Sequence, residues 1–164
     1  MKDLFSIKGK VALVTGGSRG IGEMIASGFL ASGAKVYISS RKVEICDATA
    51  ERLKKEYGGE CISLPSDLSN LEGIESLVSE LSNKESHLDI LINNAGAAWG
   101  ASLDEYPENG WDKVMDTNVK GVFFLTQKLL PLLREGIKNE PSRVVNIGSI
   151  DGLSAGAFEN YAYG

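Results

Sequence analysis

The chain has 164 residues, 43% of them hydrophobic and 24% charged, a composition that fits one globular domain spanning residues 1–164. Its net charge of −5 at pH 7 argues against nucleic acid or an anionic membrane as the main partner. No apolar run reaches signal-peptide length near the N-terminus, or the roughly 20 residues of a membrane span elsewhere, so we expect a cytoplasmic protein.

Strand-like and helix-like segments alternate along the chain. Short apolar runs predict strands near residues 10–15, 35–39, 60–64, 89–93 and 143–148. Helical periodicity predicts helices near residues 20–32, 43–57, 70–85 and 108–134. This alternation favours right-handed β-α-β crossovers, and therefore an α/β fold with a parallel sheet between two layers of helices.

The first predicted strand runs directly into a glycine-rich turn. Residues 11–22 read VALVTGGSRGIG, with Gly16, Gly20 and Gly22 in the spacing T-G-x-x-x-G-x-G. Glycine allows positive φ in such a turn and lets backbone N–H groups approach a phosphate, to which the next helix presents its positive end. The pattern predicts a dinucleotide pyrophosphate site, and a plain flexible turn is the alternative.

The helix after this turn has an amphipathic pattern. Its larger apolar residues fall on one side: Ile21, Met24, Ile25, Phe29 and Leu30. Gly33 marks the expected end of the helix.

The second strand ends in basic rather than acidic residues. A carboxylate at this point would hold the free 2′-hydroxyl of the adenosine ribose, whereas Arg41 can bind a 2′-phosphate through its planar guanidinium. Arg19, within the glycine turn, can reach the same phosphate. The two arginines favour NADP over NAD, and ordinary solvated surface arginines are the alternative.

The ends of the third and fourth strands carry further candidate nucleotide contacts. Asp67 is a candidate partner for the adenine, and a helix N-cap explains it equally well. The segment Asn93–Asn94–Ala95–Gly96 combines amides with small residues, so that a flat ring can lie against the chain. A simple turn is the alternative there.

Four later residues are candidate catalytic groups. Asn118 lies on an apolar side of the fourth helix, where its amide must find polar partners. Ser149 follows the last apolar strand, and Tyr161 and Tyr163 follow 12 and 14 residues later. Spacing alone does not distinguish catalytic from structural roles for these residues.

Metal and disulfide chemistry have little support in the sequence. Cys46 and Cys61 form neither a C-x-x-C pair nor a set with histidines, and His87 is the only histidine. We therefore expect reduced, buried thiols and no metal site.

Together, the segments TGGSRGIG (15–22) and NNAG (93–96), Asn118, Ser149 and YAYG (161–164) resemble the short-chain dehydrogenase/reductase family in order and separation. The stretch from Trp99 to Trp111 and the ending G-S-I-D-G…Y-A-Y-G resemble the family's 3-oxoacyl-carrier-protein-reductase-like members, including the β-ketoacyl reductase linked to rhamnolipid synthesis. The resemblance implies a Rossmann-type doubly wound sheet of order 3-2-1-4-5, in three α/β/α layers, without the family's C-terminal strands. The residues expected to bind NADP(H) are Gly16, Ser18, Arg19, Gly20, Ile21, Gly22, Arg41, Asp67, Leu68, Asn94, Ala95 and Gly96.

The resemblance also implies a catalytic set of Asn118, Ser149 and Tyr163, with Tyr161 as the other candidate for the tyrosine. Ser149 would hold the oxygen of a carbonyl or alcohol substrate, possibly an acyl thioester, and the tyrosine would exchange its proton during hydride transfer. The full-length parent is expected to be a homodimer or homotetramer.

The family's lysine, four residues after the tyrosine, falls beyond Gly164. Bringing a tyrosine pKa from about 10 to near 7 needs roughly 4 kcal/mol, which one cation about 4 Å away can supply. We therefore expect residues 1–164 alone to bind NADP weakly or not at all and to be inactive. A non-catalytic NAD(P)-binding regulatory or sensor module is the alternative function, and a P-loop protein is disfavoured because no G-K-[S/T] follows the glycines.

Overall fold

A computed structural model describes residues 5–136, 140–152 and 159–163. Its strands are β1 (Val11–Thr15), β2 (Lys35–Ser39), β3 (Cys61–Ser63), β4 (Ile90–Asn93) and β5 (Arg143–Asn146). Its main helices are α1 (Gly20–Ala31), α2 (Val43–Tyr57), α3 (Leu71–Lys84), α4 (Glu108–Met115) and α5 (Val122–Glu135). The strands form one parallel sheet of order β3-β2-β1-β4-β5, which confirms the predicted topology.

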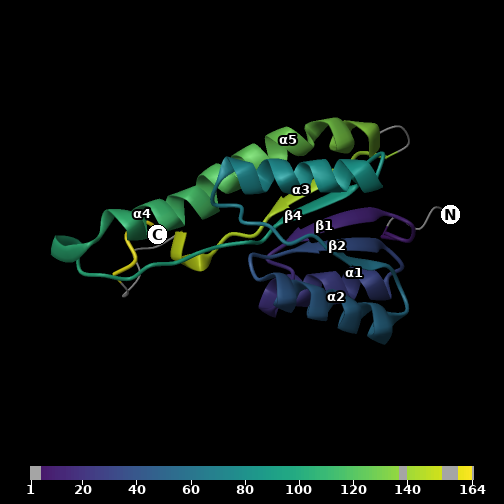
Figure 1. The fold of residues 1–164 in the computed structure, drawn as a ribbon, viewed down its shortest axis with the longest axis horizontal. Coiled ribbons are helices and arrows are strands. Elements are labelled where there is room, and N and C mark those ends of the chain that lie inside the picture. Colours follow the sequence, from purple (N-terminus) through teal and green to yellow (C-terminus); the bar gives the residue numbers. More distant parts are fainter. Residues whose placement is uncertain (1–4, 137–139, 153–158, 164) are drawn as a thin grey trace.

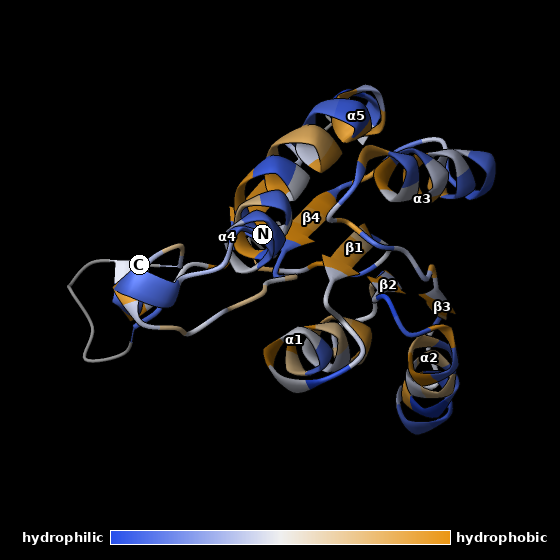
Figure 2. Ribbon diagram, turned by 60° about the vertical axis from the view of Figure 1, so that its left-hand side comes forward, coloured by the Kyte–Doolittle hydropathy of each residue, from blue (hydrophilic) through white to orange (hydrophobic). Residues whose placement is uncertain are grey.

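The sheet lies between two layers of helices, as the alternating pattern predicts (Figure 1). Helices α1 and α2 cover one face, and α3 and α5 cover the other. Successive β1 residues point to opposite faces, so Leu13 belongs to the core on the α3–α5 side and Val14 to the core on the α1–α2 side. In Figure 2, the orange colour of β1 and β4 shows that these strands are hydrophobic, and all of their residues are buried.

The predicted helix at residues 108–134 is one continuous helical stretch with an irregular centre. Between α4 and α5 lies a π-helical segment, η2 (Asp116–Gly121), whose flanking residues Met115 and Val122 keep right-handed helical φ and ψ. A π segment adds a residue to the turn and changes the direction in which the following side chains point. Asn118 lies within it.

Helix α1 packs on the sheet with only some of its larger apolar residues: Leu30 is buried, and Ile25 and Phe29 pack against the same core. Ile21 and Met24 are 58% and 65% exposed, whereas Gly22, Ala26 and Leu30 are buried. The small side chains of Gly22 and Ala26 allow the helix backbone to lie close to the sheet, which bulkier residues would prevent. Ile21 and Met24 therefore face away from the sheet, although the sequence pattern groups them with the residues that pack on it.

Both cysteines are buried and unpaired, as expected from their spacing. Burial raises the pKa of the Cys61 thiol to about 12, and the neighbouring Cys46 acts in the same direction. The Cys61 thiol therefore remains protonated at neutral pH, and both cysteines serve as small core side chains. No helix in the described part of the chain has the length and apolar character needed to cross a bilayer.

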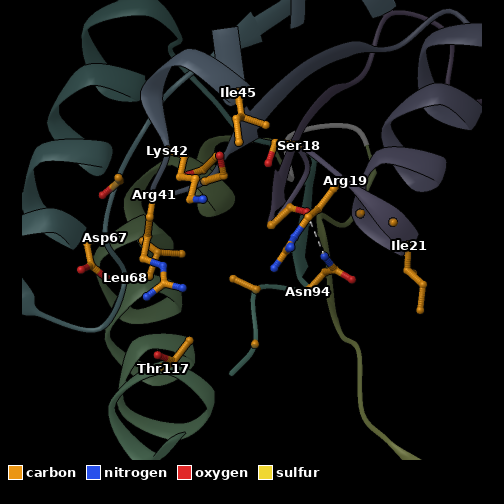
Figure 3. A pocket seen from close by; sticks show the side chains of 18 residues that line it. Ser18, Arg19, Ile21, Arg41, Lys42, Ile45, Asp67, Leu68, Asn94 and Thr117 are labelled. Atoms are coloured by element: carbon orange, nitrogen blue, oxygen red, sulfur yellow. Dashed lines mark hydrogen bonds between the residues drawn. The ribbon is translucent and has the colours of Figure 1, made fainter. Parts of the chain in front are cut away.

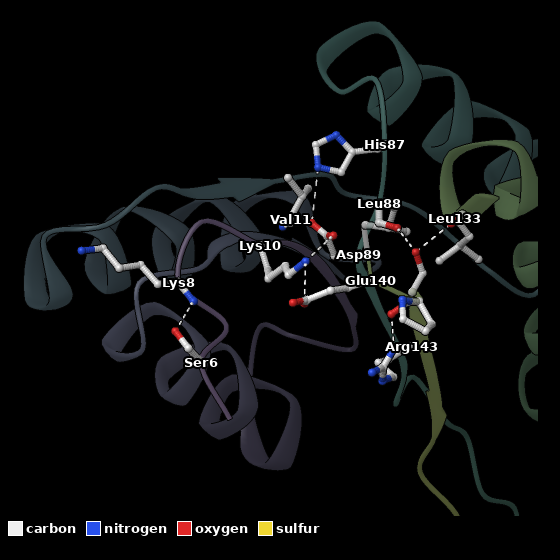
Figure 4. A network of polar contacts seen from close by, with 12 residues as sticks. Ser6, Lys8, Lys10, Val11, His87, Leu88, Asp89, Leu133, Glu140 and Arg143 are labelled. Carbon is white, nitrogen blue, oxygen red and sulfur yellow. Dashed lines mark hydrogen bonds and ion pairs between the residues drawn. The ribbon is translucent and has the colours of Figure 1, made fainter. Parts of the chain in front are cut away.

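A polar network fixes the amino ends of β1 and β4 (Figure 4). Asp89 is 6% exposed, and its carboxylate accepts the Val11 N–H at 2.8 Å and pairs with Lys10 at 3.2 Å. His87 lies 3.3 Å from the same carboxylate, so it is held in the network rather than fully solvated. Burial alone would lower the pKa of Lys10, but Asp89 and Glu140 outweigh burial and the pKa is raised.

We expect Asp89→Ala to lower the free energy of unfolding by about 2 to 3 kcal/mol, because it leaves the buried Val11 N–H without an acceptor. Asp89→Asn should cost about 1 kcal/mol, since an amide oxygen can still accept that hydrogen bond. The half-exposed Glu140 provides the control, and Glu140→Ala should cost less than about 1 kcal/mol. Urea unfolding of the three variants measures the order, and equal losses for Asp89→Ala and Glu140→Ala would contradict it.

Candidate functional site

A pocket of about 870 Å³ opens where β1, β2 and β4 end and α1 begins. In a sheet of this order, β1 lies where the connections turn to opposite sides, which is where open α/β sheets leave a crevice. The pocket walls include all twelve residues expected to bind the cofactor: Gly16, Ser18, Arg19, Gly20, Ile21, Gly22, Arg41, Asp67, Leu68, Asn94, Ala95 and Gly96. Six further residues that sequence reasoning missed line the same walls: Ser39, Ser40, Lys42, Ile45, Ser66 and Thr117.

The glycines of the turn are needed for two different reasons. Gly16 and Gly20 have positive φ angles of 65° and 55°, which other residues rarely adopt. Gly22 lies inside α1, and a Cβ there would be 2.5 Å from Asn94 Nδ2 and closer still to the Gly16 carbonyl oxygen. Gly22 is therefore required by packing between helix and turn rather than by backbone conformation.

The N-terminus of α1 presents free donors to the pocket. Its first helical hydrogen bond runs from the Glu23 N–H to the Arg19 carbonyl. The N–H groups of Gly20, Ile21 and Gly22 precede that bond and have no partner within the helix. They and the helix dipole make this wall of the pocket suited to an anion.

The Thr15 side chain joins the turn to the segment after β4. Its hydroxyl donates to the Ile92 carbonyl at 3.1 Å and accepts the N–H groups of Asn94 and Ala95 at 2.9 and 3.0 Å. The Asn94 amide returns a hydrogen bond to the Thr15 carbonyl at 2.9 Å and a longer one to Gly16, drawn in Figure 3. These contacts hold two walls of the pocket at a fixed separation.

The neighbouring residues Asn93 and Asn94 have different roles. Asn94 lines the pocket, whereas the Asn93 side chain is buried behind it and donates to Thr126 Oγ1 at 3.1 Å and Asn146 Oδ1 at 2.8 Å. Asn93 therefore links β4 to α5 and β5, and it has no direct place in the cavity wall.

The basic residues converge on one end of the pocket. Figure 3 shows the side chains of Arg19 and Arg41 extending into it from opposite sides, with Lys42 beside Arg41. Within the described residues, neither guanidinium forms an ion pair. The hydroxyl oxygens of Ser39 and Ser40 are buried nearby without a hydrogen-bond partner in the described chain. This end therefore offers both charge and donors to a phosphate group.

Asp67 lines the pocket and does not cap the following helix. One of its carboxylate oxygens accepts the N–H and the hydroxyl of Ser69 at 3.0 and 2.8 Å, which closes a local turn. The N-cap of α3 is Asn70, whose side chain accepts the Gly73 N–H at 2.8 Å. The helix-capping interpretation of Asp67 is therefore wrong.

The expected catalytic residues Asn118, Ser149 and Tyr163 do not line the pocket, although Asn118 directly follows the pocket residue Thr117. Asn118 Oδ1 accepts the Ala97 N–H at 2.8 Å, and its Nδ2 donates to the Ala97 carbonyl at 2.9 Å. Its amide thus has the polar partners that an apolar helix side requires, and it holds the segment after β4 against η2. Ser149 Oγ accepts the Asp151 N–H at 3.2 Å, which leaves the serine proton available.

The two tyrosines lie beside the segment that follows β4. The Ala101 N–H donates to the Glu159 carbonyl at 2.9 Å, and the Tyr161 ring packs edge-on against Tyr106 with centroids 5.8 Å apart. The Tyr163 N–H donates to the Asn160 carbonyl at 2.8 Å. Across the described ranges, no hydrogen bond joins the side chains of Asn118, Ser149 and Tyr163 directly.

Comparison with known proteins gives consistent matches. Residues 10–164 match the short chain dehydrogenase family. The rhamnolipids biosynthesis 3-oxoacyl-[acyl-carrier-protein] reductase of Pseudomonas aeruginosa is 52% identical over an alignment of 165 residues, which covers 100% of this chain and 64% of that protein. Gluconate 5-dehydrogenase of Gluconobacter oxydans is 36% identical, over 90% of this chain and 56% of that protein. The chain thus spans less than two thirds of the length of these relatives.

Solved structures agree with the sequence matches. The Pseudomonas aeruginosa RhlG/NADP active-site complex superposes with a TM-score of 0.93 at 52% identity, covering 100% of this chain and 64% of that one. L-sorbose reductase from Gluconobacter frateurii, complexed with NADPH and L-sorbose, superposes with a TM-score of 0.89 at 28% identity, covering 96% and 59%.

The packing at Gly22 gives a test of the turn. We expect Gly22→Ala to lower the free energy of unfolding by about 2 kcal/mol, because its methyl group would overlap Gly16 and Asn94. Gly28 lies in the same helix with open space around its Cβ position, so Gly28→Ala should be neutral or stabilise by up to about 1 kcal/mol. Urea unfolding measures both, and equal effects of the two substitutions would refute the packing role of Gly22.

Proposed function

The chain belongs to the short-chain dehydrogenase/reductase family, and from this we propose that residues 1–164 form the NADP(H)-binding part of an oxidoreductase acting on a carbonyl or alcohol substrate. The observation that carries this proposal is the pocket at the ends of β1, β2 and β4. Its walls combine the free N–H groups at the start of α1 with the guanidinium groups of Arg19 and Arg41, which form no ion pair with any residue that the structure describes.

The choice of NADP over NAD rests on charge at the end of β2. Ser40, Arg41 and Lys42 follow this strand, where a carboxylate would favour the free 2′-hydroxyl of NAD. Arg41 and Arg19 can together neutralise a 2′-phosphate, and the Ser39 and Ser40 hydroxyls can donate to the ribose or its phosphate. Two solved relatives, described as complexes with NADP and NADPH, support this assignment.

The proposed reaction is hydride transfer between the nicotinamide and a substrate carbon, which is the chemistry that NADP(H) supplies when bound. Ser149 would hold the substrate oxygen, because its Oγ already accepts the Asp151 N–H and its own proton can be donated. Tyr163 would exchange a proton with that oxygen. Asn118 would position the segment that follows β4, since its Oδ1 and Nδ2 are both hydrogen-bonded to the backbone of Ala97.

The candidate substrate is a 3-oxoacyl thioester, on the basis of the name of the 52% identical relative. The full-length enzyme would act as a homodimer or homotetramer.

Cofactor selection can be measured on the chain by titration with NADPH and NADH. We expect the chain to bind NADPH more tightly than NADH. Arg41→Ala should lower the affinity for NADPH by about 10- to 100-fold, the contribution of a charged hydrogen bond, and leave the affinity for NADH unchanged. Lys55, an exposed residue near the end of α2 and outside the pocket, gives the charge-matched control Lys55→Ala, which should alter neither. Equal affinity of the unaltered chain for both cofactors would remove the role of Arg41.

A further inference from the structure

We propose that Thr49 is a positioning residue for the phosphate-binding turn, although it lies outside the pocket. This inference rests on the proposed cofactor site. Thr49 belongs to α2 and is 6% exposed, and its hydroxyl donates to the Ser18 carbonyl at 3.1 Å. A buried side chain of one helix thus reaches the backbone of a turn that belongs to another β-α unit.

The hydrogen bond sets the orientation of one peptide group. In a trans peptide the C=O and the following N–H point in opposite directions. Because Thr49 holds the Ser18 carbonyl toward α2, the Arg19 N–H must point away from α2. Ser18 and Arg19 both line the pocket, as Figure 3 shows, and the Arg19 N–H has no acceptor among the residues that the structure describes.

The rest of the turn is fixed by other elements. The Gly17 N–H donates to the Ser39 carbonyl at 3.1 Å, and the Gly16 carbonyl accepts from the Asn94 amide at 3.4 Å. Thr49 therefore adds the contact that governs the Ser18–Arg19 peptide specifically. An ion pair between Arg52 and Glu23 at 2.6 Å links α2 to α1 and keeps Thr49 opposite the turn.

The consequence concerns one part of the cofactor only. With the hydroxyl absent, the Ser18 carbonyl loses its partner, and rotation of the peptide would bring a carbonyl oxygen in place of an N–H toward the diphosphate. A carbonyl oxygen repels a phosphate, whereas an N–H binds it. The 2′-phosphate contacts at Arg41 and Lys42 come from a different segment and should be unaffected. The Arg19 guanidinium lies at the end of a long, flexible side chain, so it can still reach the 2′-phosphate after the Ser18–Arg19 peptide rotates.

The experiment compares the binding of two ligands to four forms of the chain: the unaltered chain, Thr49→Val, Thr49→Ser and Arg41→Ala. NADPH carries the diphosphate and the 2′-phosphate, whereas adenosine 2′-monophosphate carries only the latter. Thr49→Val keeps the shape of the side chain and removes the hydrogen-bond donor. We expect it to lower the affinity for NADPH about five- to tenfold, the contribution of one hydrogen bond, and to leave the affinity for adenosine 2′-monophosphate within about twofold of that of the unaltered chain. Thr49→Ser restores the donor and should restore NADPH binding. Arg41→Ala should weaken both ligands.

A second measurement needs no variant. In two-dimensional NMR of the unaltered chain, the Arg19 amide should be among the signals most shifted by NADPH and little shifted by adenosine 2′-monophosphate. Thermal unfolding checks that Thr49→Val remains folded.

Equal weakening of both ligands by Thr49→Val, no weakening of NADPH, or an Arg19 amide that does not respond to NADPH would each overturn the role of Thr49. Binding of neither ligand to the unaltered chain would overturn the proposed cofactor site itself. Binding of both ligands with no effect of Thr49→Val removes only this inference.

Discussion

The Thr15 hydroxyl is the contact on which the site most depends. It lies at the end of β1, in the middle of the sheet, and makes three hydrogen bonds to the backbone around the end of β4. A hydroxyl can donate once and accept twice, so its capacity is fully used. The glycine turn and the Asn94–Gly96 segment, which form facing walls of the pocket, are therefore held together by one small side chain.

Much of this arrangement is predictable from the sequence because it follows from local rules. A strand such as Val11–Thr15, apolar on both faces, must lie inside a parallel sheet. In such a sheet the carboxyl ends of all strands meet at one edge, so the residues that follow them are brought together. That geometry brings the four segments together, and the family resemblance added the individual residues, so that twelve residues could be assigned to one pocket before their positions were known.

The parts that could not be predicted depend on packing between elements. Helical periodicity does not distinguish α4 and α5 from the π-helical turn between them. Within that turn, Asn118 forms hydrogen bonds with Ala97, a residue of a distant segment that periodicity does not take into account. Hydrophobicity groups Ile21 and Met24 with Leu30, but only Leu30 is buried, and the rest of the buried side of α1 consists of the small residues Gly22 and Ala26. Thr49 has no motif at all, since its partner is a carbonyl 31 residues earlier.

The carboxylate of Asp89 gives the β1–β4 pair a property that neither strand has alone. It joins the two strands at their amino ends, while the opposite ends are joined at Thr15, so a sliding movement of one strand along the other would break contacts at both extremities. The centre of the sheet therefore behaves as a rigid frame. Any rearrangement that accompanies ligand capture must be taken up by the surrounding helices and connecting segments.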